Sequence, residues 1–142
     1  MVGGQVVDIL SENREIGMET LRYLHTHKTG ALFRASVRVG GILGGANGAE
    51  LEALTGFGER VGLAFQVVDD ILDLEGVTEE LGKPAGSDLK KKKATYPALM
   101  GIEASRREAA HIIEEAKRAL VGLGEKAWAL AAMADFIAAR RN

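Results

Sequence analysis

The stretch GLAFQVVDDILDLEG, residues 62–76, places three aspartates inside an otherwise apolar run. Its apolar residues recur at spacings of three and four, which predicts a helix. On a helical wheel, at about 100° per residue, the polar side chains share one arc about 100° wide. They are Gln66, Asp69, Asp70 and Asp73. Because apolar side chains occupy the rest of the circumference, we expect a mostly buried helix whose acidic stripe faces something other than bulk water.

Helical periodicity extends over most of the remaining chain. The long helix predicted over residues 51–72 has Asn47 as its N-cap. A helix over residues 21–43 ends in a glycine-rich turn, and another begins at SRRE, residues 105–108, which has the form of a capping box. Alternating strand patterns are absent from the sequence, so we expect an all-α fold, an antiparallel helical bundle. The apolar faces of the 21–43 helix and of a last helix are, respectively, Leu21, Leu24, Ala31, Leu32, Ala35, Val39 and Leu43, and Trp128, Ala132, Phe136 and Ile137.

Composition limits the classes of protein to which the chain can belong. Its 142 residues are 46% apolar, which is enough for one domain with a core of its own. A formal net charge of −2 provides no general attraction for nucleic acid or for an anionic membrane surface. There is no cysteine, and no apolar run approaches the roughly 18 residues of a membrane span. We therefore expect a soluble, cytoplasmic protein that binds no nucleic acid and has no membrane span.

The first residues, MVGGQVVDIL, resemble the interior of a helix that is already under way. They include none of the capping residues that normally begin a helix. We therefore expect a further segment to precede residue 1 in the complete protein.

Lysines occur at three places where they would meet an anion bound near the aspartates. Lys28 lies in HKTG, residues 27–30, and Lys83 lies in LGKP, within a long loop expected over residues 76–97. A run of four lysines ends at Lys93. Each lysine also has a plainer interpretation as a solvated residue, and GKP is not a P-loop, because it lacks the earlier glycine and the following Ser or Thr. Loops of this length in compact domains are often functional.

The aspartates are close enough to repel one another, and in a partly dry setting a bound cation would relieve that repulsion. Hard oxygen ligands favour Mg²⁺ or Ca²⁺. Mg²⁺ typically uses one or two protein carboxylates, several waters and the phosphate oxygens of a substrate. These residues therefore indicate a phosphate ligand bridged by metal, with an exposed acidic helix face as the plainer alternative.

The chain contains, in order, the motifs GGQVVD, HKTGALFRASVRVGG, GLAFQVVDDILD and LGKPAGSDLKKKKATYP. Together they closely resemble the C-terminal half of the trans-isoprenyl diphosphate synthases, in particular bacterial farnesyl or geranyl diphosphate synthases. The resemblance covers essentially the whole chain. It implies the all-α bundle of the isoprenoid (class I terpenoid) synthases, of which residues 1–142 would form the C-terminal half of a single domain. The aspartates would then be the second of two acidic motifs that face each other across a central cavity.

The resemblance also assigns ligands for metal and diphosphate. It implies that Mg²⁺ is the cofactor and that it grips the diphosphate of an allylic substrate. The implied metal ligands are Asp69, Asp70 and Asp73, and the implied diphosphate-binding lysines are Lys28, Lys83 and Lys93.

Further residues would line the same cavity by this resemblance. Thr29 and Gln66 would place oxygens near the allylic carbon, and Phe65 would pack beside isopentenyl diphosphate. Gln5 and Asp8 match a GQxxD element of the family, for which a role in helix packing or a structural hydrogen bond is an equal alternative.

The implied reaction joins an allylic diphosphate to isopentenyl diphosphate through an allylic carbocation and releases diphosphate. Charge that develops on the leaving group sets the barrier, and metal ions and lysines stabilise that charge in a cavity poor in water. Farnesyl diphosphate is the favoured product, ahead of the shorter and longer homologues. No protein general base is evident in the sequence.

The sequence also departs from the family pattern. A complete synthase of this kind carries a first acidic motif and a neighbouring arginine pair, and neither occurs here. We therefore expect this chain to be inactive alone, to need the missing N-terminal half, and to form a homodimer as family members do. Two alternatives stay open: a class I terpene cyclase, which would consume no isopentenyl diphosphate, and a non-catalytic helical subunit of a partner synthase.

Overall fold

The computed structural model describes residues 1–75 and 94–140, and within these two ranges every regular element is a helix. The all-α prediction is therefore confirmed. In chain order the elements are α1 (Val2–Leu10), α2 (Met18–His25), the π-helix η1 (Thr26–Gly30), α3 (Ala31–Leu43), α4 (Gly48–Glu75), α6 (Tyr96–Met100), α7 (Ile102–Ala119), the 3₁₀-helix η2 (Val121–Ala127) and α8 (Trp128–Ala138).

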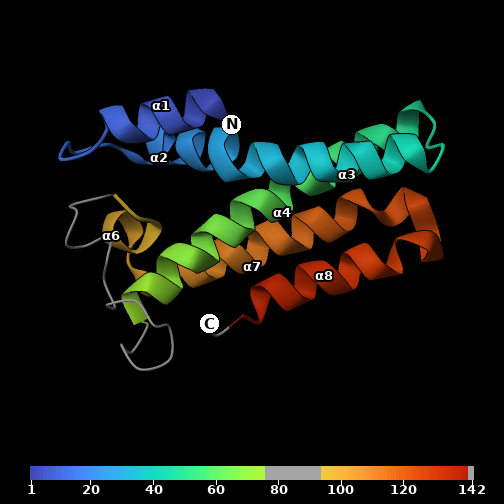
Figure 1. Ribbon diagram of the computed structural model, residues 1–142. Helices are drawn as coiled ribbons and strands as arrows, with labels where there is room; N and C mark the ends of the chain where they lie inside the picture. Colours follow the sequence, from blue (N-terminus) through green and yellow to red (C-terminus); the bar gives the residue numbers. More distant parts are fainter. Residues whose placement is uncertain (76–93, 141–142) are drawn as a thin grey trace.

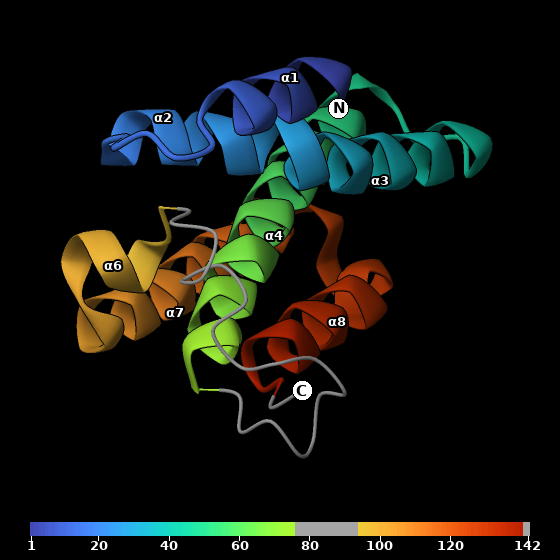
Figure 2. The same ribbon diagram turned by 60° about the vertical axis from the view of Figure 1, so that its left-hand side comes forward.

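The helices form two layers (Figures 1 and 2). In one layer, α2, η1 and α3 make a continuous rod, and α1 lies across η1. In the other, α4 crosses beneath this rod and packs against α7, with α8 beside both. Successive long helices run in opposite directions, as expected for an antiparallel bundle. None of the described helices is long and apolar enough to cross a membrane.

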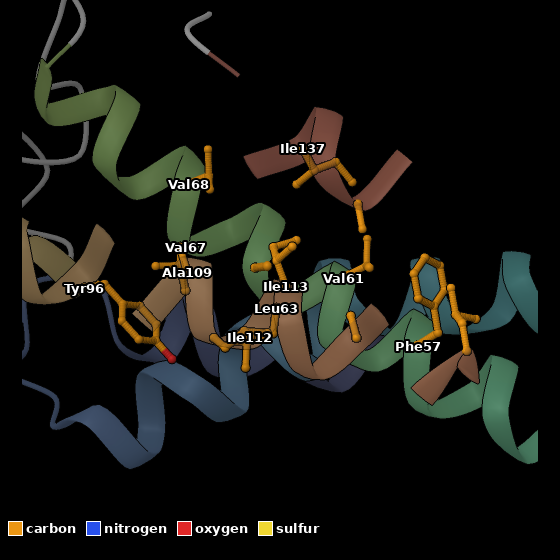
Figure 3. Packing of buried hydrophobic residues seen from close by; sticks show 14 of the residues in the cluster. Phe57, Val61, Leu63, Val67, Val68, Tyr96, Ala109, Ile112, Ile113 and Ile137 are labelled. Carbon is orange, nitrogen blue, oxygen red and sulfur yellow. The ribbon is translucent and has the colours of Figure 1, made fainter. Parts of the chain in front are cut away.

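The core is centred on α4, which packs against the rod above it and against α7 and α8 in its own layer (Figure 3). Phe57, Val61 and Val67 have no exposed surface, and they meet Ile112 of α7 and Ile137 of α8 in one apolar cluster. Full burial of such a side chain contributes roughly 1.5–3 kcal/mol. The helix that carries the acidic stripe is therefore also the helix that the rest of the bundle packs around.

The predicted start of α4 is confirmed in detail. The side-chain oxygen of Asn47 accepts a hydrogen bond from the backbone N–H of Glu50 at 3.0 Å, and the Glu50 carboxylate accepts one from the backbone N–H of Asn47 at 2.9 Å. This reciprocal pair satisfies two backbone donors that a helix start leaves open. The cap fixes the turn between α3 and α4.

Two glycines allow the layers to approach closely. A Cβ on Gly62 of α4 would lie 2.7 Å from the Cα of Gly30 in η1. A Cβ on Gly4 of α1 would lie 2.5 Å from backbone atoms of His27 and Lys28. Because backbone atoms cannot move aside as a flexible side chain can, only glycine fits at these crossings. The crossings bring α1, η1 and α4 together around one end of the acidic stripe.

The helix predicted over residues 21–43 is interrupted. Residues Thr26–Gly30 adopt a π-helix between two α-helical parts, although the sequence pattern shows an unbroken apolar face. Single π-helical turns inside helices are rare and occur frequently at functional sites. Hydrophobic periodicity does not reveal such a turn, because the turn inserts only a local change of register.

The capping box predicted at residues 105–108 is wrong. Helix α7 begins three residues earlier, at Ile102, after Gly101 with a φ of 83°. Ser105 is buried inside the helix, and its hydroxyl donates to the carbonyl oxygen of Gly101 at 2.9 Å. A glycine at positive φ marks the sharp break between α6 and α7, and the sequence analysis overlooked that signal.

The predicted apolar faces of the 21–43 helix and of the last helix are only partly buried. Leu21, Leu24 and Ile137 belong to the buried residues as predicted. Several others stay exposed, since α3 and α8 lie at the outside of the described bundle: Leu32 (56%), Val39 (54%), Leu43 (83%), Trp128 (73%) and Phe136 (71%). The periodicity identified the apolar face correctly but not what covers it.

Replacement of Gly4 by alanine tests the crossing of α1 over η1. We expect Gly4→Ala to lower the free energy of unfolding by about 1–3 kcal/mol, because the new methyl overlaps the backbone at residues 27–28. Urea unfolding followed by circular dichroism measures this change.

Gly3→Ala is the matched control, since a Cβ there meets nothing within 4 Å. That variant should be neutral or more stable by up to about 1 kcal/mol, because alanine is the better helix former. Equal destabilisation by both variants would contradict the proposed close approach.

Candidate functional site

A pocket of about 220 Å³ lies where α1, α2, η1 and α4 meet. Its lining is mainly polar, with apolar side chains from α2 and from residues just before α2 and α6. The polar lining residues are Asp8, Ser11, Glu12, His25, Lys28, Gln66, Asp69 and Asp70, and the apolar ones are Ile16, Leu21, Leu24 and Ala94. The pocket therefore brings Lys28 to Asp69 and Asp70, as the sequence predicted, and adds residues of α1 and α2.

Asp70 is the most buried member of the acidic stripe, with 8% of its surface exposed. Its Oδ2 atom accepts two hydrogen bonds, one from the Nε2 of His25 at 3.1 Å and one from the backbone N–H of Tyr96 at 2.9 Å. A carboxylate can only accept, so the Nε2 of His25 carries the proton of the first bond. Both hydrogen bonds use the same oxygen, which leaves Oδ1 as the atom that the described residues do not engage.

The three aspartates differ in exposure within the described residues. The side chain of Asp69 is 58% exposed and lies 3.9 Å from a guanidinium nitrogen of Arg140, whereas Asp73 is partly buried. Consecutive residues such as Asp69 and Asp70 point about 100° apart on a helix, so they can differ in burial. Asp69 and Asp70 both line the pocket, and Asp73 does not.

The described residues do not provide a complete metal cage. Within residues 1–75 and 94–140, no three or more His, Cys, Asp or Glu side chains are grouped so that they could hold a metal ion by themselves. Asp69 and Asp70 nevertheless line one pocket and offer hard oxygen donors. Such a donor set fits a magnesium ion that takes its remaining ligands from water and from a phosphate.

Among the described residues, Lys28 supplies the ammonium group that lines the pocket, and it is already paired. Its Nζ donates to Oδ2 of Asp8 at 2.8 Å, and both side chains are partly buried. Asp8 stands one helical turn after Gly4, the residue at which α1 touches the backbone of η1. The close crossing of α1 and η1 therefore fixes the distance between these two charges.

Three other predicted residues occupy different surroundings. Gln66 lines the pocket, whereas Thr29 and Phe65 do not. The ring of Phe65 packs against Phe33, with 5.3 Å between ring centroids, and the guanidinium of Arg140 lies 4.5 Å from its centre. The structure thus brings Gln66 to the acidic groups and places Phe65 on another side of α4.

Some predicted residues lie outside the described part of the chain. Lys83 and Lys93 belong to residues 76–93. Gln5, from the GQxxD element, is exposed on α1 and does not line the pocket, while its companion Asp8 does.

His25 and the backbone N–H of Tyr96 were missed by the sequence analysis. A signal for His25 was present, since it follows Leu21 and Leu24 on the buried face of α2 at helical spacing. A histidine on such a face needs a polar partner. Nothing in the sequence pattern pointed to the Tyr96 N–H, because that contact depends on how the chain returns to α4 after residue 93.

Among the described residues, carboxylates outnumber ammonium groups in the pocket lining. Four carboxylates line it, those of Asp8, Glu12, Asp69 and Asp70; the ammonium of Lys28 pairs with Asp8, and the guanidinium of Arg140 lies 3.9 Å from Asp69. An anion that entered alone would meet net repulsion from these groups. The pocket is therefore suited to a ligand in which anionic oxygens arrive together with divalent cations.

Comparison with known proteins gives consistent results. A family model described as Polyprenyl synthetase matches residues 1–132. A geranylgeranyl diphosphate synthase of Cyanophora paradoxa is 44% identical over an alignment of 143 positions, which covers all of this chain and 48% of the relative. A farnesyl diphosphate synthase of Escherichia coli (strain K12) is 44% identical over an alignment of 146 positions, which covers all of this chain and 49% of the relative.

A solved structure of a Helicobacter pylori geranyltransferase, complexed with magnesium and isoprenyl diphosphate, is 33% identical and superposes with a TM-score of 0.79. The alignment covers 96% of this chain and 45% of that one. The fold is thus the all-α fold of the isoprenyl diphosphate synthases. The chain spans about half the length of the curated relatives that it matches.

Substituting Asp70 and Asp69 by alanine, one at a time, compares the loss of a buried carboxylate with the loss of an exposed one. We expect Asp70→Ala to lower the free energy of unfolding by about 1–3 kcal/mol, because the His25 Nε2–H and the Tyr96 N–H lose their acceptor. Asp69→Ala should change it by no more than about 0.5 kcal/mol, as is usual at exposed positions. Urea unfolding of both variants measures the difference, and equal effects would contradict the burial described for Asp70.

The hydroxyl of Tyr96 allows a prediction about pH. Tyr96 is 2% exposed, and its hydroxyl is buried with no hydrogen-bond partner in the described residues. Burial raises the pKa of Tyr96 above its ordinary value of 10.0. The neutral phenol is favoured in the fold, so its contribution to stability is complete below pH 10.0 and is lost as the pH rises through the folded-state pKa.

We therefore expect Tyr96→Phe to raise the free energy of unfolding by about 1 kcal/mol at neutral pH, since the unpaired hydroxyl is removed. Above pH 10.0 the advantage of the variant should grow. Denaturant unfolding across this pH range measures both effects. Tyr23→Phe, at a tyrosine that is 44% exposed, is the matched control and should show neither.

Proposed function

The chain belongs to the polyprenyl synthetase family, and from that membership we propose that it supplies one wall of a prenyltransferase active site. The reaction joins an allylic diphosphate, dimethylallyl or geranyl diphosphate, to isopentenyl diphosphate and releases diphosphate. The observation that carries this proposal is the pocket in which Lys28, Gln66, Asp69 and Asp70 meet. These residues come from two of the motifs on which the resemblance rests.

The proposed cofactor is Mg²⁺, which Asp69, Asp70 and Asp73 would hold directly or through water. Its support is the donor set described above and the related geranyltransferase that was solved with magnesium and isoprenyl diphosphate. When bound, the metal neutralises the charge that develops on the departing diphosphate. The described residues place four carboxylates beside one lysine in the pocket. These carboxylates would repel a diphosphate, so the diphosphate would need the positive charge of the metal in order to bind there.

The chain's own residues have separate tasks in this proposal. Lys28 exchanges Asp8 for a diphosphate oxygen and so stabilises the leaving group as a compact point charge. Gln66 turns its side-chain oxygen toward the allylic carbon without acting as a nucleophile. Ile16, Leu21 and Leu24 exclude water, which would otherwise trap the cation as an alcohol.

Three assignments rest on the family resemblance alone. Lys83 and Lys93 would add positive charge to the same diphosphate, from a segment outside the described residues. Thr29 would serve the allylic carbon next to Gln66, and Phe65 would contact isopentenyl diphosphate. Since neither Thr29 nor Phe65 lines the pocket, both roles require that the site extends beyond it.

We propose that the rest of the site comes from a polypeptide segment equivalent to the N-terminal half of the relatives. Exposed apolar side chains support this partner, because they gather on α1, α3 and α8. Large examples are Val2, Val6, Ile9, Val39, Ile42, Trp128 and Phe136. Exposed apolar surface of this extent is typical of an interface. The completed protein would act as a homodimer in the cytoplasm, and this chain alone would not turn over substrate.

Farnesyl diphosphate is the proposed product. The relatives include both a farnesyl and a geranylgeranyl diphosphate synthase. The assay must therefore measure the length of the prenyl product.

The test is a prenyltransferase assay on the chain, alone and together with the N-terminal segment of its family. Isopentenyl and dimethylallyl diphosphates are supplied with Mg²⁺, and radiolabelled products are separated by chain length. We expect product only with both segments, and none after addition of EDTA. Product formed without consumption of isopentenyl diphosphate would instead identify a terpene cyclase, and no product from the pair would contradict the catalytic assignment.

Lys28→Ala should lower the rate of the assembled protein by about a hundredfold, because one preorganised charge on the leaving group is lost. Lys126→Ala removes an exposed lysine far from the pocket lining and is the matched control, with no expected change. A rate for Lys28→Ala equal to that of the control would exclude the proposed role of this lysine.

A further inference from the structure

His25 has a contact that the proposed reaction does not use. It is buried at the end of α2, with 9% of its surface exposed, and its Nε2 lies 3.1 Å from Oδ2 of Asp70. Its ring stacks on Tyr96, with 5.7 Å between ring centroids and 13° between planes. The backbone N–H of Tyr96 binds the same Oδ2 atom at 2.9 Å. Two donors from different segments therefore hold one carboxylate oxygen.

We propose that His25 is a positioning residue: by holding Oδ2, it orients the Asp70 carboxylate so that Oδ1 can serve a divalent cation bound with diphosphate. This inference rests on the proposed function, since it assumes that Asp70 meets such a cation. A carboxylate on a single Cβ–Cγ bond can rotate, and one hydrogen bond from Tyr96 would leave that rotation less restricted. Two donors on one oxygen fix the plane of the group.

The position of His25 in the chain adds a second argument. His25 is the last residue of α2, and the π-helical turn begins at the next residue. Lys28 follows three residues later and lines the same pocket. One short segment thus sets both the carboxylate that would face the cation and the lysine that would face the diphosphate. Groups that act from the second layer around a metal typically change metal affinity by about 10- to 100-fold when they are removed.

Two substitutions separate the hydrogen bond from the shape of the ring. His25→Phe keeps an aromatic ring to stack on Tyr96 but removes the donor. His25→Gln removes the ring but keeps an N–H donor at a similar reach. His27→Phe is the control, because His27 is exposed, lies two residues away in the adjoining π-helical turn and stacks on Tyr23.

Titration calorimetry of the chain, assembled with the N-terminal segment used in the activity assay, with Mg²⁺ and inorganic pyrophosphate measures the effect. We expect His25→Phe to weaken binding of this complex by about 10-fold or more. His25→Gln should stay within about threefold of the unaltered chain, and His27→Phe should match it. A merely structural histidine would give a different pattern, with both His25 variants weakened alike or neither weakened, and either result would overturn the inference.

A second measurement tests the role of His25 even if the proposed function is wrong. If the chain assembled with the N-terminal segment, both without substitutions, binds no pyrophosphate with Mg²⁺, the proposed function fails. The inference is then decided by urea unfolding of His25→Phe, Asp70→Ala and the double variant. A midpoint shift of the double variant smaller than the sum of the single shifts supports the restraint on Asp70, and additive shifts overturn it.

Discussion

The hydrogen bonding of one buried carboxylate determines how the site is assembled. Asp70 lies on the central helix, where an unpaired charge would cost several kcal/mol. Its two donors come from His25 at the end of α2 and from the Tyr96 N–H at the start of α6. Three segments that are distant in sequence therefore converge on one oxygen atom. The apolar core of α4 supplies the rigidity on which this convergence depends, since α4 contacts every layer of the bundle.

The pocket forms where helices that pack on this core cross one another closely. Glycines at positions 4 and 62 let α1 and α4 approach the π-helical turn from two sides, and the turn carries Lys28 between them. The same approach gathers an excess of carboxylates around one ammonium group. Geometry and charge thus lead to one conclusion, because a pocket of this composition accepts phosphate oxygens only with cations that compensate the acidic wall.

Much of this arrangement could be predicted from the sequence, for identifiable reasons. Long-range periodicity fixed the helical class, and the Asn47 cap of α4 follows from a local pattern. Contacts between segments were harder to predict. The helical wheel placed Asp69 and Asp70 on one arc, but only packing decides which side chain turns inward. The π-helical turn and the exposed face of Trp128 also depend on neighbours that periodicity does not specify.

The ion pair between Lys28 and Asp8 makes ligand capture an exchange of partners. An ammonium group has three N–H donors, so an incoming anion either shares Lys28 with Asp8 or replaces it; where it replaces Asp8, the net electrostatic gain is a difference between two similar attractions. The displaced carboxylate then joins the other acids of the wall and increases their demand for positive charge. Each anion captured in this way strengthens the hold of the pocket on the cations that accompany it, so the two kinds of ligand would bind cooperatively.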